Sequence, residues 1–285
     1  MKNNAFTRKY LSLLLALLLS LSLFGCGKKS AGDTADAAAI DGGMPADEAA
    51  PAETGAETAG EASSPSPEGD ATATPAPTMM VFANDEERKF YEAYDCIFGT
   101  ASEKADYSKA VRLMRPLAES GYAQAQYYMG YMYEYGYGVK QDDVVSLDWY
   151  VKAAESGSTK SMINLGLMYE YGDGVEQDYS TALAWYKAAA NAGDATSTTN
   201  IGWMYQNGKG VEPDDSAAFS WYLLGANAGI PTAMRFVGWM YYYGKGVEQS
   251  NDNAKFWLQM AVDNGDTAGA YLLKAVDSNM SEVGN

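Results

Sequence analysis

The chain has 285 residues and a formal net charge of −17 at neutral pH, and it contains no histidine. An acidic surface repels the phosphate backbone of nucleic acid, which proteins bind mainly through lysine and arginine, so nucleic acid is excluded as a principal partner. Without histidine the chain lacks the commonest general base and the commonest zinc ligand, so we expect no catalytic residues, no metal site and no cofactor.

Residues 1–25 have the layout of a bacterial export signal. Three basic residues precede the apolar run 10–24, which is mostly leucine, and a basic end followed by a short hydrophobic segment is typical of such signals. The run ends in Leu23-Phe24-Gly25-Cys26, which resembles the lipobox of bacterial lipoproteins. The resemblance implies cleavage before Cys26, lipidation of its sulfur and anchoring to a bacterial membrane. A non-cleaved membrane anchor is the alternative.

Residues 26–83 are predicted to form a disordered tether after the lipidated cysteine. They consist almost entirely of Ala, Gly, Asp, Glu, Thr, Ser and Pro, and such a composition buries too little apolar surface to offset the entropy of ordering. The remainder of the chain would then be exported and held on the extracytoplasmic side of the membrane.

From residue 121 the sequence repeats with a period of 36 residues. Gly-x-Gly-Val occurs at 136–139, 172–175, 208–211 and 244–247, and each unit begins with a marker glycine, which stands at 121, 157, 193, 229 and 265. A fixed period of this size is typical of repeat architectures. We therefore expect four full units: 121–156, 157–192, 193–228 and 229–264.

Each unit is predicted to form two antiparallel helices, here named its first and second helix. In the second unit, Met162, Leu165, Gly166 and Tyr169 follow the spacing of one helical face. The first glycine of each Gly-x-Gly suits the positive φ that follows a helix end. The residue six positions later suits an N-cap of the second helix; these residues are Asp142, Asp178, Asp214 and Ser250.

Two further recurring residues are expected to pack the two helices together. A glycine stands nine residues after each marker, at 130, 166, 202 and 238, and the absence of a Cβ there should let two backbones approach closely. A tryptophan stands 28 residues after each marker, at 149, 185, 221 and 257, and should pack against the first helix.

The sequences Gly136–Asp142 and Trp149–Ala154 carry the patterns Gly-x-Gly-Val-x-x-Asp and Trp-Tyr-x-x-Ala-Ala, which resemble those of the Sel-1-like repeat (SLR) family. The resemblance implies an all-α fold, an α/α solenoid of helix-turn-helix repeats related in shape to tetratricopeptide repeats. By the same pattern, residues 84–120 are a degenerate N-terminal repeat and residues 265–285 a C-terminal capping helix and tail. Cys96, beside Ile97 and Phe98, is expected to be a small buried hydrophobic residue rather than a reactive thiol.

The positions that vary between units indicate a binding face on the first helices. They lie 6, 10, 13 and 14 residues after the marker, on one helical face. In tetratricopeptide-like solenoids the first helices line the concave side, so the resemblance implies a groove rich in aromatic residues, which dominate binding hot spots. The candidate groove residues are Tyr127, Tyr131, Glu134, Tyr135, Leu167, Glu170, Tyr171, Trp203, Gln206, Asn207, Arg235, Trp239, Tyr242 and Tyr243.

Two alternatives remain open within this set. The residues ten after the marker (Tyr131, Leu167, Trp203 and Trp239) either line the groove or pack as core between adjacent helices. Glu134 and Glu170 are either paired catalytic carboxylates or a solvated acidic rim, and the lack of any group to shift a pKa favours the rim.

The sequence thus predicts a membrane-anchored scaffold or adaptor that holds a protein or an extended peptide on its concave face. Binding of cell-wall glycan or muropeptide by the same aromatic groove is the alternative, because aromatic side chains also stack on extended ligands. An enzyme is disfavoured.

Overall fold

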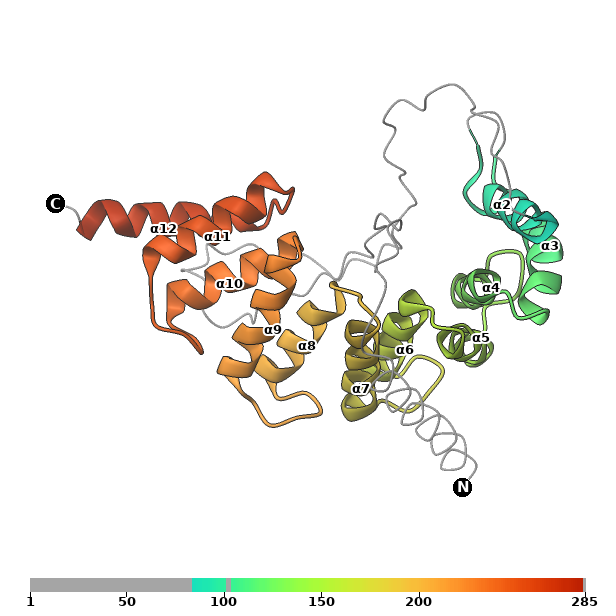
Figure 1. The fold of residues 1–285 in the computed structure, drawn as a ribbon, viewed down its shortest axis with the longest axis horizontal. Helices are drawn as coiled ribbons and strands as arrows, with labels where there is room; N and C mark the ends of the chain where they lie inside the picture. Colours follow the sequence, from blue (N-terminus) through green and yellow to red (C-terminus); the bar gives the residue numbers. More distant parts are fainter. Residues whose placement is uncertain (1–83, 101–103, 284–285) are drawn as a thin grey trace, which may run out of the picture. The chain divides into compact units, whose positions relative to one another are not determined.

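The computed structural model describes residues 84–100 and 104–283, and this part of the chain contains eleven α-helices and no strand (Figure 1). The predicted export signal, Cys26 and the tether lie outside these residues. No helix in the described part is long and apolar enough to cross a membrane. The helices are α2 (Asp85–Phe98), α3 (Tyr107–Glu119), α4 (Ala123–Tyr135), α5 (Asp143–Glu155), α6 (Thr159–Tyr171), α7 (Tyr179–Asn191), α8 (Ser197–Asn207), α9 (Asp215–Asn227), α10 (Pro231–Tyr243), α11 (Asn251–Asp263) and α12 (Gly269–Val283).

Consecutive helices pack against each other along the whole row (Figure 1). The four complete units are the hairpins α4–α5, α6–α7, α8–α9 and α10–α11, and each second helix also packs against the first helix of the next unit. The first helix α10 additionally contacts α8 and α12, its counterparts on either side. The predicted all-α solenoid of stacked hairpins is therefore confirmed.

The loop inside each hairpin ends one helix and begins the next as the sequence predicted. Gly172 ends α6 with a φ of 83°, and its N–H donates to the carbonyl of Met168 at 2.8 Å. Asp178 then caps α7 by accepting from the N–H groups of Ser180 and Thr181. The corresponding side chains in the other units accept in the same way from a backbone N–H three residues ahead; they are Asp142, Asp214 and Ser250.

The second glycine of each loop also sets the spacing between units. Gly174 has a φ of 69° and lies so close to the start of α5 that a Cβ would come within 2.5 Å of the backbone carbon of Asp143. Gly210 and Gly246 lie in the same way against the starts of α7 and α9. The Gly-x-Gly loop of each hairpin therefore packs directly against the start of the second helix of the preceding hairpin.

The two ends of the row are less regular, as expected. The degenerate N-terminal unit is the pair α2–α3, and burial raises the pKa of the half-buried Cys96 thiol, which fits a packing role better than a thiolate. At the other end, the predicted capping helix is α12, which begins at Gly269. The Asp266 carboxylate accepts from the N–H of Gly269, the first residue of this helix, at 3.1 Å.

Candidate interaction surface

The residues 14 positions after each marker are the most exposed members of the predicted groove. Tyr135 is 41 % exposed, Tyr171 63 % and Tyr243 36 %. The third unit has Asn207 at this place, and its side-chain N–H donates to the carbonyl of Trp203 one turn earlier at 2.9 Å. Three of the four first helices thus present a tyrosine near their C-terminal end.

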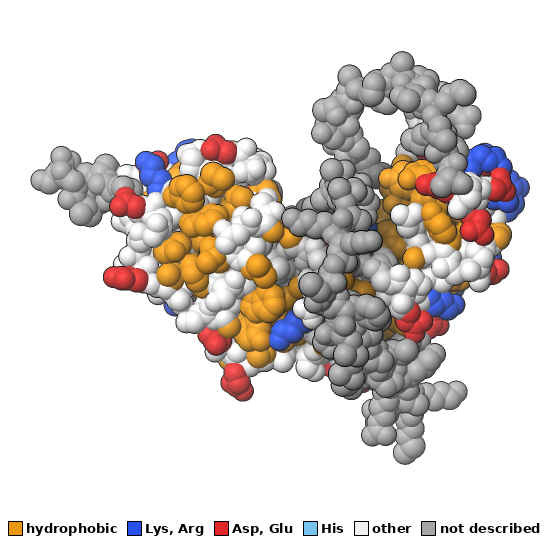
Figure 2. Space-filling model, viewed as in Figure 1, with side chains coloured by type: hydrophobic (Ala, Val, Ile, Leu, Met, Phe, Trp, Pro, Cys, Tyr) orange, Lys and Arg blue, Asp and Glu red, His pale blue; other side chains and the backbone are white. Residues whose placement is uncertain are grey.

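The residues ten positions after the marker are half-buried, and two of them pack against these tyrosines. Tyr131 and Tyr135 have ring centroids 4.7 Å apart, and Trp239 and Tyr243 have centroids 5.1 Å apart. Trp203 packs against the apolar cores of two neighbouring hairpins, and Leu167 packs against one of them. The side chains ten positions after the marker are therefore part of the core and, at the same time, partly accessible to solvent. Figure 2 shows hydrophobic side chains gathered on the surface in the region of α10.

The residues 13 positions after the marker lie inside the hairpins, between the two helices. The Tyr150 hydroxyl donates to Glu134 at 2.5 Å, and the Tyr186 hydroxyl donates to Glu170 at 2.7 Å. In the third unit Tyr222 donates to Gln206 at 2.9 Å. Glu170 is 9 % exposed, so the prediction of a solvated acidic rim is wrong.

Burial sets the protonation behaviour of these two carboxylates. It raises the pKa of Glu134 and of Glu170, and the hydrogen bond from the tyrosine opposes this effect without cancelling it. The expectation that nothing nearby shifts their pKa values is therefore also wrong. Each carboxylate is an acceptor within its own hairpin, where it satisfies a buried tyrosine hydroxyl.

The remaining candidate residues are engaged in contacts within the protein. The ring of Tyr127 lies 5.7 Å from that of Tyr150, and Tyr242 packs beside Leu258. Arg235 forms an ion pair with Asp266 at 2.8 Å, and the two side chains are 11 % and 7 % exposed. This ion pair joins α10 to the loop before α12, so the guanidinium is not open to a partner.

The sequence prediction missed the tyrosine that recurs 29 positions after the marker. Tyr150, Tyr186 and Tyr222 are fully buried, and a Cβ on Gly166 would lie 2.6 Å from Cδ1 of Tyr186. The mid-helix glycine therefore makes room for a tyrosine ring rather than for a second backbone. A signal was present, because the fourth unit replaces both the tyrosine, by Leu258, and its acceptor, by Tyr242.

Across residues 84–100 and 104–283, no group of three or more acidic, cysteine or histidine side chains is placed to hold a metal ion. Within the groove set, the two carboxylates are occupied by tyrosine hydroxyls and the guanidinium by an aspartate. The solvent-exposed part of this surface is mainly a row of aromatic side chains, which are suited to binding another molecule.

Comparison with known proteins identifies the type of repeat. A family model described as the Sel1 repeat matches residues 97–122, 123–158, 159–194, 195–230 and 231–266. Its boundaries between complete units fall two residues after those expected from the marker glycines. No curated protein matches the chain.

Two solved structures are similar in both sequence and fold. One is a Sel1 repeat protein from Oxalobacter formigenes, with 31% identity and a TM-score of 0.62, and the match covers 65% of this chain and 76% of that one. The other is a protective antigen of uropathogenic Escherichia coli with an SLR fold, with 32% identity and a TM-score of 0.62. That match covers 66% of this chain and 40% of the antigen.

Proposed function

The chain belongs to the Sel1 repeat family, whose members generally mediate protein–protein interaction, and on this basis we propose that it is a membrane-anchored scaffold that binds a protein or an extended peptide on its first helices. The ligand lies along the face formed by successive first helices. The scaffold stands on the extracytoplasmic side of a bacterial membrane, held by lipid on Cys26.

One observation carries the binding part of this proposal. The exposed tyrosines 14 positions after the marker recur on the first helices α4, α6 and α10, and two of them pack against a half-buried aromatic residue one turn earlier. Rigid aromatic side chains that pack against a neighbouring ring supply a large contact area and lose little conformational entropy on binding, as binding hot spots require.

The direct test removes the exposed tyrosines and leaves their supports in place. In the full chain, Tyr135→Ser, Tyr171→Ser and Tyr243→Ser together are expected to reduce partner capture in a pull-down from the native cells by tenfold or more, since each lost hot-spot contact costs on the order of 1–2 kcal/mol. Quantitative mass spectrometry of the captured proteins measures the loss. Circular dichroism checks that the variant is folded.

A matched control places the same change on a second helix. Phe256 on α11 is 57 % exposed, and Phe256→Ser is expected to leave capture unchanged. Equal capture by the triple variant and the parent chain would reject the groove. Co-sedimentation with purified cell wall, lost in the triple variant while no protein is captured, would instead favour the glycan alternative.

The anchor is tested at the other end of the chain. We expect mass spectrometry of the protein from its native membrane to find an N-terminus at Cys26 that carries acyl chains, since two or more chains give stable anchoring. The variant Cys26→Ser should be released from the membrane fraction. An intact N-terminus at Met1 without acyl mass would disprove lipidation.

A further inference from the structure

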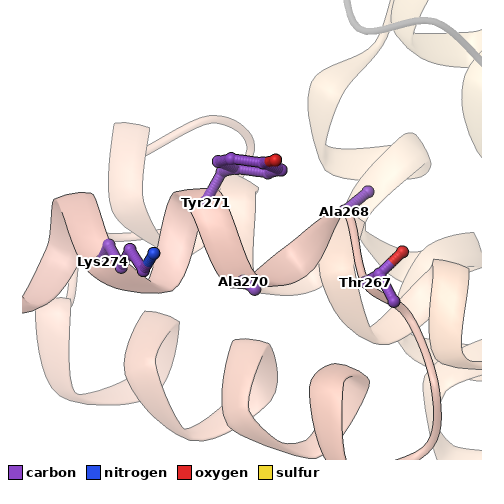
Figure 3. A pocket seen from close by; sticks show the side chains of 5 residues that line it. All are labelled: Thr267, Ala268, Ala270, Tyr271 and Lys274. Carbon is purple, nitrogen blue, oxygen red and sulfur yellow. The ribbon is translucent and has the colours of Figure 1, made fainter.

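The exposed side of α12 carries a shallow surface pocket of about 430 Å³. Figure 3 shows the side chains that line it in the N-terminal half of the helix and in the turn before it: Thr267, Ala268, Ala270, Tyr271 and Lys274. Tyr271 is 80 % exposed, more than any other large hydrophobic side chain among the described residues. Lys274 is exposed and forms no ion pair with any described residue.

In the complete units, the residues at the corresponding positions of the first helix contact the second helix of the same hairpin. Ala270, Tyr271 and Lys274 stand 5, 6 and 9 residues after the marker Gly265. In the first unit, Gln126 at position 5 accepts from the Ser156 hydroxyl at 3.4 Å, and the ring of Tyr127 at position 6 lies 5.7 Å from that of Tyr150. Position 9 is Gly130, which lies directly against the Tyr150 ring. Among the described residues no second helix covers this side of α12.

We propose that this side of α12 binds an amphipathic helix of a partner protein, which packs where the second helix lies in a complete unit. This surface is separate from the proposed groove, because it lies on the side of a first helix that packs against the second helix in a complete hairpin. The occupant is helical because all four complete units place a helix at these positions.

Lys274 defines the chemistry of the occupant. In complete units this position is a glycine that makes room for a tyrosine or leucine side chain. A lysine there fills that space and adds a positive charge, so the occupant needs a carboxylate opposite it and small apolar residues opposite Ala270 and Thr267. A second copy of this chain is disfavoured as the occupant, since two chains of net charge −17 repel each other.

The probe is a hydrocarbon-stapled, fluorescein-labelled peptide with the sequence of residues 178–192, carrying Tyr186→Glu. By fluorescence anisotropy, we expect the full chain to bind it about tenfold more tightly than the peptide that carries Tyr186→Gln, because only the carboxylate pairs with Lys274 and the two side chains have the same size. Lys274→Glu should reverse this preference, and Tyr271→Ser should weaken both peptides. Lys245→Glu, an exposed lysine in the loop after α10, is the charge-matched control and should change nothing.

Failure of both peptides to bind, or a preference that survives Lys274→Glu, would overturn the proposal. So would a dimer in sedimentation analysis that dissociates on Tyr271→Ser, because the occupant would then be a second copy. The outcome is independent of the groove: the triple tyrosine variant described above should bind the peptide as the parent chain does.

Discussion

Gly166→Ala is expected to destabilise the protein by about 1–3 kcal/mol, although alanine is the better helix former. The added Cβ would lie 2.6 Å from Cδ1 of Tyr186. That ring is fully buried and pinned by the hydrogen bond from its hydroxyl to Glu170. Since the ring cannot turn away without breaking that bond, the two helices must separate. Urea unfolding followed by circular dichroism measures the change.

A helical glycine with free space provides the control. A Cβ on Gly269 in α12 would meet nothing closer than 3.5 Å, so Gly269→Ala should be neutral or slightly stabilising. The double variant Gly166→Ala with Tyr186→Ala should lose less stability than the sum of the single changes, because the clash and the ring disappear together. Additive losses, or a stable Gly166→Ala protein, would show that the ring is not the constraint.

The framework of this fold could be predicted because its signals are local in sequence. A helix end at Gly172 and a cap at Asp178 depend on backbone conformations and hydrogen bonds that span a few residues, and both are present. The 36-residue period then required the hairpins to stack, since an isolated hairpin cannot bury its apolar face.

The candidate site was predicted less well because its decisive contacts join residues 16 apart on two helices. The bond between Tyr186 and Glu170 depends on how the helices of a hairpin cross, and no local spacing encodes that crossing. Neighbouring positions 13 and 14 are also separated by about 100° around the helix. Glu170 therefore faces the second helix while Tyr171 is 63 % exposed, and treating both as one outward face was too coarse.

Glu170→Gln, combined with Glu134→Gln, is expected to raise the stability of the protein at pH 7. Burial raises the pKa of both carboxyl groups, so the native state binds protons more readily than the unfolded chain. Their contribution to stability is then fully present below the unfolded pKa of about 4.3 and is lost as pH rises through the native pKa. Above its native pKa each group is charged and partly desolvated, at a cost that glutamine does not incur.

The third unit already contains the proposed arrangement, since Gln206 accepts from Tyr222 at 2.9 Å. Glutamine therefore keeps the acceptor and removes only the charge. The gain in thermal midpoint should be clear at pH 7 and shrink towards zero below pH of about 4, where both wild-type carboxyls are protonated. Glu176→Gln, in the exposed loop before α7, is the control and should show no such trend.

A second substitution separates the role of charge from the role of the hydrogen bond. Glu170→Leu removes the acceptor and leaves the buried Tyr186 hydroxyl without its partner, which should cost about 1–3 kcal/mol at both pH values. If Glu170→Gln instead lowers stability at pH 7, the charge-assisted hydrogen bond outweighs the desolvation of the carboxylate. The glutamine variant removes only the charge and the leucine variant also removes the acceptor, so the difference between them determines which of these two effects decides the stability of the hairpin.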